Sequence, residues 1–349
     1  MMRLRMTRRE WLASMAALAY SARGRPAFAA AAAFKPTPAL LDAARAEGRL
    51  MLYTAEFIEV IQETLAAFNK RFPFVKVDVL RLSGGQLITR VQTEAAAGKL
   101  AADVVDHSDA ALMKRIEDLF QDYAPPNARD YTRNALVSPK LWPTLAPGWS
   151  IAYNSELVKN PPRTWMDLCK PEYGDGQIGQ VIGPSGGTTW CRIMFERQVL
   201  GENYWAKQAA TKPRLYPSGA PLSDALVRGE VAIAPLLYDI VYPKKKEGAP
   251  LGILFPKEGV PVSYYATGIP KTAKNVNAAR LYLDWVLSPE GQEFSTVQHG
   301  DFSVLISPPA APQGFDPKTD KIWVPEFNKS QELHDKWLAD WNRVYGYRQ

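Results

Sequence analysis

Apolar and polar positions along the first half of the chain follow a pattern typical of parallel strands covered by helices. Leu50 to Tyr53 is a short apolar run and predicts a strand. The next stretch has helical spacing, with one face formed by Phe57, Val60, Ile61, Thr64, Leu65 and Phe68. Further strands are expected at 75–80 and 103–106, with helices over 87–98 and from Asp109, a candidate N-cap, to Phe120. Alternation of this kind indicates βαβ units.

The second half repeats the pattern. Strands are expected at 149–154, 177–182, 231–234 and 251–255, and helices at 188–200, around 225–228 and after 234. A strand at 262–268 is expected to return to the first block, because the helices predicted after it, 278–287 and 289–297, need a sheet to cover. The aromatic C-terminal helix should pack across one lobe. The chain is therefore expected to be an α/β protein with two lobes, each a mainly parallel sheet flanked by helices.

The first 29 residues have the pattern of an export signal. Basic residues precede an apolar run from Trp11 to Tyr20, and Ala27-Phe28-Ala29 fits a signal-peptidase site. Thr7-Arg8-Arg9 resembles the twin-arginine signal. The apolar run is about ten residues long, whereas a membrane span needs about 20. We expect residues 1–29 to be a twin-arginine-type signal peptide and the mature protein to be periplasmic.

Removal of that segment changes the meaning of the net charge. The full chain of 349 residues carries +6, and residues 1–29 hold six Arg and one Glu, a local +5, which leaves the mature chain near +1. The strong basic footprint of a nucleic-acid-binding protein is therefore missing, and no nucleic-acid partner is expected. Two cysteines, Cys169 and Cys191, exclude a disulfide framework and a Cys-rich zinc site, and leave a single disulfide open.

Candidate ligand-binding residues lie in the loops that follow the predicted strands, since ligands of open parallel sheets bind beyond the carboxyl ends of the strands. Two of these loops are Ser-Gly-Gly turns that open helices, where glycine lets a ligand approach the backbone and the helix N-terminus attracts an anion. Aromatic candidates for lining the cleft are Trp149, Tyr153, Trp190, Tyr264 and Tyr265. The predicted ligand-binding residues are Thr54, Glu56, Ser83, Gly84, Gly85, Ser108, Asp109, Ser185, Gly186, Gly187, Thr188, Tyr238 and Asp239.

An enzymatic alternative comes from Gly183-Pro184-Ser185-Gly186-Gly187, which matches the G-x-S-x-G pattern of serine hydrolases. In that hypothesis Ser185 is the nucleophile, and Asp239 and His299 are the partners in the right chain order. The HGGG-type oxyanion element is absent from the sequence, as are the common metal and nucleotide motifs. A binding protein without catalytic residues or cofactor is the favoured interpretation.

From about Leu50 to Gln298 the chain resembles the family-1 extracellular solute-binding proteins, in particular the group that contains ferric-ion-binding proteins. The resemblance rests on the Pro184 to Gly187 loop and on two further motifs, Gly229-Glu230-Val231-Ala232 and Gly268 to Asn275, the latter preceding the Ser288 to Gln292 segment. It implies a type II periplasmic-binding-protein fold with the ligand cleft between two lobes joined by crossing strands. The implied lobes are 34–130 plus 264–315 and 131–263 plus 316–349. It also implies a monomeric capture component that passes a small-molecule ligand to the membrane permease of an ABC importer.

The ligand implied by the resemblance is open. Ferric binders of this group have two adjacent tyrosines where this chain has Tyr238-Asp239, so iron would keep Tyr238, Asp239 and Glu56, with a synergistic anion. The anion loop at 185–187 is intact. An anionic or zwitterionic organic solute, such as a phosphonate, phosphate ester or carboxylate, is therefore the main expectation, and ferric iron the alternative.

Overall fold

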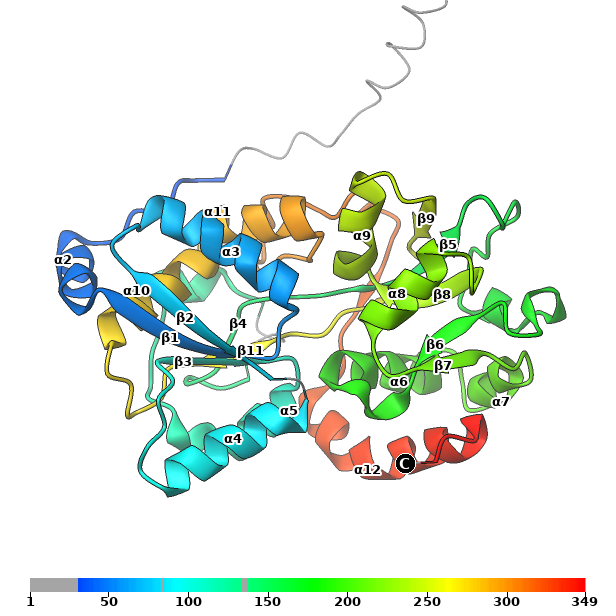
Figure 1. Cartoon of the computed structure of the whole chain (residues 1–349), viewed down its shortest axis with the longest axis horizontal. Coiled ribbons are helices and arrows are strands. Elements are labelled where there is room, and N and C mark those ends of the chain that lie inside the picture. Colours follow the sequence, from blue (N-terminus) through cyan, green and yellow to red (C-terminus); the bar gives the residue numbers. More distant parts are fainter. Residues whose placement is uncertain (1–30, 83, 133–136, 349) are drawn as a thin grey trace, which may run out of the picture.

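The two lobes of the chain lie side by side, each built on its own β-structure (Figure 1). The structure is a computed structural model and describes residues 31–82, 84–132 and 137–348. The predicted signal peptide, 1–29, and Ser83 lie outside the described residues. Among the described residues, no helix has both the length and the apolar character that crossing a membrane requires.

The first lobe contains a five-stranded sheet in the order β2-β1-β3-β11-β4. Strands β1 (Arg49–Thr54), β2 (Lys76–Arg81) and β3 (Val104–His107) are parallel, which confirms the first three predicted strands. β11 (Ala266–Gly268) pairs antiparallel with β3 and so returns to this lobe as expected. β4 (Trp142–Pro143) pairs with β11 here, so the chain leaves this sheet after β4, not at residue 131 as implied by the resemblance. The remaining lobe boundaries stay predictions.

Helices cover both faces of the first sheet. They are α2 (Pro38–Glu47), α3 (Ile58–Arg71), α4 (Gly85–Ala96), α5 (Ala110–Arg115), α10 (Val276–Val286) and α11 (Pro289–Phe294). α3 buries Val60, Ile61, Thr64, Leu65 and Phe68, the face predicted from their spacing. The helix predicted from Asp109 to Phe120 is shorter than expected, because it ends at Arg115 and a 3-10 turn (Glu117–Leu119) follows. The helix predicted at 289–297 likewise ends at Phe294, before a π-helical turn (Ser295–His299).

The second lobe differs from the expected mainly parallel sheet. β5 (Trp149–Asn154) lies between β8 (Ile233–Leu237) and β9 (Leu251–Leu254) and is antiparallel to both. β6 (Gly179–Val181) and β7 (Arg214–Tyr216) form a separate parallel pair, linked to β8 by a bridge between Ile178 and Ile233. The prediction was wrong on strand direction, because a buried strand shows the same apolar run whichever way its neighbours point.

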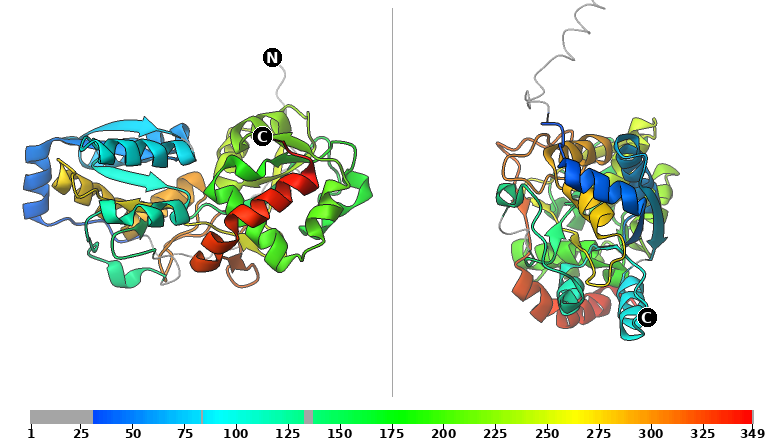
Figure 2. Two further views of the ribbon diagram at one scale, coloured as in Figure 1. Left: turned by 90° about the horizontal axis from the view of Figure 1, so that it is seen from below. Right: turned by 90° about the vertical axis from the view of Figure 1, so that its left-hand side faces the viewer.

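The helices of the second lobe are α6 (Gly187–Val199), α7 (Tyr204–Ala209), α8 (Gly219–Val227), α9 (Tyr238–Lys246) and α12 (Phe327–Tyr345). α12 lies across this lobe, as predicted for the C-terminal helix (Figure 2), and buries Trp341 in its core. Arg192 and Glu196 of α6 form a buried ion pair, and the Trp205 indole N–H donates to the same glutamate at 2.9 Å. Cys169 and Cys191 are free thiols, so the disulfide left open by the sequence does not form.

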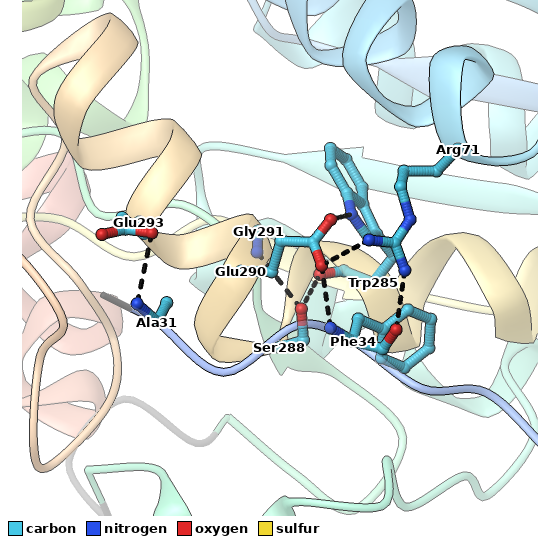
Figure 3. Close-up of polar contacts among 8 residues, drawn as sticks. All are labelled: Ala31, Phe34, Arg71, Trp285, Ser288, Glu290, Gly291 and Glu293. Carbon is cyan, nitrogen blue, oxygen red and sulfur yellow. Dashed lines mark hydrogen bonds and ion pairs between the residues drawn. The ribbon is translucent and has the colours of Figure 1, made fainter. Parts of the chain in front are cut away.

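The segment before α2 is fastened to the first lobe through Glu290 of α11 (Figure 3). The Glu290 carboxylate accepts hydrogen bonds from the Phe34 backbone N–H at 2.8 Å and from the Arg71 guanidinium at 2.9 Å. Its other oxygen accepts from the Trp285 indole N–H at 3.2 Å. Arg71 also donates to the Phe34 carbonyl at 2.7 Å. One carboxylate thus joins α3, α10, α11 and the N-terminal segment.

Several segments cross between the lobes. β10 (Val260–Pro261) and β12 (Ile322–Trp323) form a short parallel pair, and Gly148 at the start of β5 bridges to Val262. In the view from below, the chain passes between the lobes more than once (Figure 2). The loops that follow β1, β2 and β3 therefore face the loops of the second lobe across these crossings.

Candidate functional site

The carboxyl edge of the first sheet is held by a buried polar network centred on Asp106. The hydroxyls of Thr54 on β1 and Thr267 on β11 each donate to one carboxylate oxygen of Asp106, both at 3.0 Å. The Thr54 hydroxyl also accepts the backbone N–H of Glu56 at 2.9 Å, and Thr144 contacts Thr267 at 2.6 Å. Burial raises the pKa of Asp106 to about 7, and the two hydroxyls act against that rise. This network fixes the loop after β1 relative to β3 and β11.

His107, at the end of β3, fixes the next two loops. Its Nδ1 accepts the Asp109 backbone N–H at 2.8 Å, so Nε2 carries the proton and donates to the Gly84 carbonyl, also at 2.8 Å. Asp109 then caps α5, since its side chain accepts from the backbone N–H groups of Ala111 and Leu112. The two hydrogen bonds of His107 therefore fix the position of the loop before α4 relative to the loop before α5.

A cavity of about 370 Å³ lies between the lobes, within the range of small-ligand sites. It is polar and apolar in similar measure, and both lobes contribute to its wall. The first lobe supplies Ala55, Phe57, Ile58, Glu59, Arg81, Gly84 and Ser108, together with Tyr265 from the crossing segment before β11. The second lobe supplies Trp149, Val181, Ser185, Gly186, Thr188, Thr189, Pro217, Ser218, Gly219, Ala220, Leu236, Leu237 and Ile240.

The helix N-termini that open onto this cavity include those of α4, α6 and α8. The residues that precede α4, α6 and α8 are Gly84, Gly186 and Ser218, and all three line it. None of the three makes a side-chain cap hydrogen bond. The first backbone N–H groups of each helix therefore keep their donor capacity, and the helix dipoles add positive potential. Gly186 has φ +148°, a conformation that glycine adopts without strain.

The charge of the lining favours an anion. Arg81 and Glu59 are the charged side chains that line it among the described residues. The Arg81 Nε donates to the Glu56 carbonyl at 3.0 Å, which holds its guanidinium beside the loop after β1. One cation and three helix N-termini therefore oppose one exposed carboxylate, and the arrangement is suited to a phosphate or carboxylate group.

Trp149 forms an aromatic wall at the second lobe. Its indole N–H donates to the Thr188 carbonyl at 2.9 Å, and the Arg192 guanidinium lies 5.0 Å from its ring centroid. Of the predicted aromatic candidates, Trp149 and Tyr265 line the cavity, and Trp190 and Tyr264 line a smaller neighbouring one. Tyr153 packs over Gly252 instead, on β9.

The structure brings together part of the predicted ligand-binding set. Gly84, Ser108, Ser185, Gly186 and Thr188 line the cavity, whereas Asp109 and Gly187 line the smaller neighbouring one. Thr54 is buried in the Asp106 network and supports the site from behind. Gly85 opens α4 without lining the cavity, and Glu56, Tyr238 and Asp239 are buried outside it.

Two of the three side chains expected for iron, Tyr238 and Glu56, are engaged elsewhere. The Tyr238 hydroxyl donates to the Gln313 carbonyl at 2.8 Å, and its ring stacks on Tyr242 and Phe255. Glu56 accepts the Phe57 backbone N–H at 2.8 Å. Within the described ranges, no group of three or more His, Cys, Asp or Glu side chains is placed to hold a metal ion.

The residues of the hydrolase alternative do not meet. Ser185 lines the inter-lobe cavity, whereas Asp239 and His299 both line a different cavity between α3, α8 and α9. Within the described part of the chain, no hydrogen bond links the Ser185 hydroxyl to a histidine. The geometry therefore gives Ser185 no general base.

Sequence reasoning missed Arg81 and the turn Pro217–Ala220. Arg81 ends the second parallel strand, so the rule that ligands bind beyond strand ends points to it. Ser218-Gly219 is a third Ser-Gly turn that opens a helix, like the two that were identified. The signal was missed because the strand before it, β7, is three residues long and none of its residues is fully buried.

A comparison with known families decides which family this two-lobed chain represents. The family model described as bacterial extracellular solute-binding protein matches residues 53–293. The chain belongs to this family. Membership supports a periplasmic solute-binding component of an ABC transporter, with a small-molecule ligand and a membrane permease as partners. It confirms the family and the type of fold expected from the sequence motifs.

Individual relatives agree with this assignment. An uncharacterised protein of Haemophilus influenzae is 28% identical over 331 residues, which cover 86% of this chain and 93% of the relative. The periplasmic binding protein AfuA of Actinobacillus pleuropneumoniae, with fructose-6-phosphate bound, has a TM-score of 0.73 at 21% identity and covers 86% of this chain and 100% of its own. Iron-bound HitA of Pseudomonas aeruginosa has a TM-score of 0.69 at 19% identity, with 85% and 99% covered. These two structures support the fold.

Proposed function

We propose that this solute-binding protein captures a small organic anion in the inter-lobe cavity and delivers it to the permease of an ABC importer. The observation that carries the proposal is the convergence of three uncapped helix N-termini and Arg81 on one cavity. Such an arrangement stabilises a phosphate, phosphonate or carboxylate through backbone N–H donors and one guanidinium. We further propose that the protein acts as a monomer without catalysis and is exported by the twin-arginine route, on the basis of Arg8-Arg9.

A phosphate ester is the solute class with the most support. AfuA, which shares the fold, binds fructose-6-phosphate, and the cavity has room for such a molecule. Ferric iron has less support, although HitA, of the same fold, is iron-bound. The Tyr238 hydroxyl, which iron would need as a ligand, is occupied by the Gln313 carbonyl.

Arg81 provides the direct test of the proposal. Replacing it with Gln removes the one guanidinium that the described residues contribute to the cavity wall, and we expect alkyl phosphate binding, measured by calorimetry, to weaken about tenfold to a hundredfold. Arg49→Gln is the matched control, because Arg49 begins β1 at the opposite end of the same sheet and is exposed. Equal affinities of Arg81→Gln, Arg49→Gln and the wild type would contradict an anion site at this cavity.

A further inference from the structure

A second cavity, which the proposed anion site does not explain, is lined by residues of α3, α8 and α9. Figure 1 shows the end of α3 facing these two helices of the second lobe. The volume of the second cavity is about 290 Å³. Its lining includes five carboxylate side chains, those of Glu59, Glu63, Asp224, Asp239 and Glu247. Lys244 and His299 are the lining residues that can carry positive charge. We call this the acidic cavity. It shares Phe57, Glu59, Ala220 and Ile240 with the inter-lobe cavity, so the two are neighbours.

The positive side chains of the acidic cavity do not neutralise it. Lys244 already forms an ion pair with Asp224. The His299 ring is almost fully buried, and burial lowers its pKa to about 4, which Glu63, 3.3 Å away, only partly opposes. His299 is therefore uncharged at neutral pH. Glu59, Glu63, Asp239 and Glu247 remain without a counter-charge in the wall.

The buried Asp239 side chain indicates that a ligand binds in the acidic cavity. It lies in the first turn of α9, is 4% exposed, lines the acidic cavity and has one carboxylate oxygen, Oδ1, buried without a hydrogen-bond partner. Nδ1 of His299, in the same wall, also lacks a hydrogen bond. Buried polar atoms in folded proteins nearly always have a hydrogen-bond partner. We therefore expect a ligand to supply the missing hydrogen bonds in the acidic cavity.

Asp239 also lies among other buried carboxylates. Glu56 and Asp301 are each 2% exposed, and burial, together with repulsion from Asp301, raises the pKa of Asp239. Asp301 has a partner in the Ser295 hydroxyl at 2.7 Å, and Glu56 has one in the Phe57 N–H. Asp239 is the carboxylate of this group that has an oxygen atom, Oδ1, without a hydrogen-bond partner. A cation bound beside Asp239 would offset the repulsion between Asp239 and Asp301.

We infer that the acidic cavity binds the ammonium group of the solute whose anionic group binds at the helix N-termini, so that the transported solute is an amino-substituted phosphate or related zwitterion. This inference rests on the proposed function, because it places the ammonium group of the same solute next to the proposed anion site, across the four residues that line both cavities. Asp239 and Glu63 accept hydrogen bonds from the ammonium group, and Phe57 and Ile240 contact the methylene groups between the two charges.

The test uses matched pairs of probes that differ in one group. 2-Aminoethyl phosphate is compared with n-propyl phosphate, and 4-aminobutyl phosphate with n-pentyl phosphate, so that a methyl replaces the ammonium group at nearly constant length. Calorimetry on the mature protein should show at least one amino compound binding about tenfold or more tightly than its alkyl partner, the effect of one charge-assisted hydrogen bond.

Variants assign that advantage to the acidic cavity. Asp239→Asn should abolish it without weakening alkyl phosphate binding, because Asn keeps the size of the Asp side chain but removes its negative charge, and Asp239 does not line the inter-lobe cavity. Glu63→Gln, at a half-exposed side chain, should reduce the advantage by a smaller factor, about threefold. Asp78→Asn, on the surface of β2 in contact with Arg49 and Lys76, is the control and should change neither affinity.

The outcomes separate this inference from the proposed function. Alkyl and amino compounds that bind equally well would overturn the ammonium site and leave the anion site standing. An amino advantage that survives in both Asp239→Asn and Glu63→Gln would also overturn it. If no phosphate binds at all, the anion site fails and the inference fails with it. Occupation of the acidic cavity by Ca²⁺ or Mg²⁺ in competition with the amino compounds would show an inorganic cation site instead.

Discussion

At the scale of single residues, the site depends on side chains that support the cavity from behind. Asp106 joins β1, β3 and β11 through the hydroxyls of Thr54 and Thr267. It lies 4% exposed, at the point where a strand of the crossing segment enters the first sheet. The carboxylate thus holds the loop after β1 in place, and its protonation state affects the fold directly.

We expect the buried Asp106 carboxyl group to make the free energy of unfolding depend on pH. Its pKa rises from 3.8 to about 7 on folding because the site is buried, so the folded chain binds more protons than the unfolded chain between these values. Its contribution to stability is present below about pH 4 and is lost as the pH rises to about 7. Relative to Asp106→Asn, the wild type should lose roughly 1.4 kcal/mol per pH unit within that window. Urea unfolding across the pH range measures this difference.

The difference between the two proteins isolates Asp106, since Asp301 and Asp284, whose pKa values are raised to about 6, titrate in both. Asp78→Asn serves as a surface control. Unfolding free energies of the wild type and Asp106→Asn that run parallel from pH 4 to pH 7 would show that Asp106 does not titrate in this window.

Residue roles were harder to predict than residue positions. Thr54 was expected to bind ligand because it follows a strand, and its hydroxyl instead donates to Asp106. Tyr238 was expected at the site, and its ring is stacked and its hydroxyl bound to Gln313. A sequence shows which residues follow a strand, but the direction of each side chain depends on partners that are distant along the chain.

At the scale of elements, the first residue of α6 lies directly against the backbone of the first lobe. A Cβ built on Gly187, its first residue, would lie 2.6 Å from the Asp109 Cα and would overlap the Ser108 carbonyl. Both neighbours are backbone atoms of the first lobe, which cannot turn aside as a side chain can. Glycine at this position therefore allows the N-terminus of α6 to meet the loop before α5.

Gly187→Ala should consequently hold the lobes apart. We expect a larger radius of gyration by small-angle X-ray scattering in the presence of ligand, and ligand affinity reduced about tenfold or more, because the added methyl opposes the close approach. The lobes themselves should stay folded, since alanine favours helix formation.

Gly85→Ala is the matched control for that variant. Gly85 is also the first residue of its helix, and nothing lies within 4 Å of a Cβ built there. A Gly187→Ala protein with the scattering profile and affinity of the wild type would show that the close contact is not needed for binding.

Element positions were largely predictable, and strand directions were not. The N-cap at Asp109, the buried face of α3 and the glycine turn before α6 each follow from local chemistry. The antiparallel course of β5 between β8 and β9 depends on how the chain crosses between lobes, which the apolar pattern does not record. The resemblance to solute-binding proteins implied those crossings, and local patterning did not.

At the scale of the whole molecule, function depends on the two lobes meeting around a shared cavity. Each lobe alone would expose its helix N-termini to water, where an anion gains little from them. Between the lobes, the N-termini of α4, α6 and α8 and the Arg81 guanidinium face one enclosed volume. An anion bound there would contact both lobes at once, and we expect its binding to favour the arrangement in which the lobes meet.

Ligand-dependent thermal unfolding of the mature chain tests this account most directly. Phosphate esters, phosphonates and carboxylates are compared with neutral alcohols of the same carbon skeleton. We predict that at least one anion class raises the unfolding midpoint and that its alcohol does not, with about 2.7 kcal/mol of stabilisation at a concentration of 100 times the dissociation constant. Stabilisation by ferric iron alone, or equal effects of anions and alcohols, would contradict capture of an organic anion between the lobes.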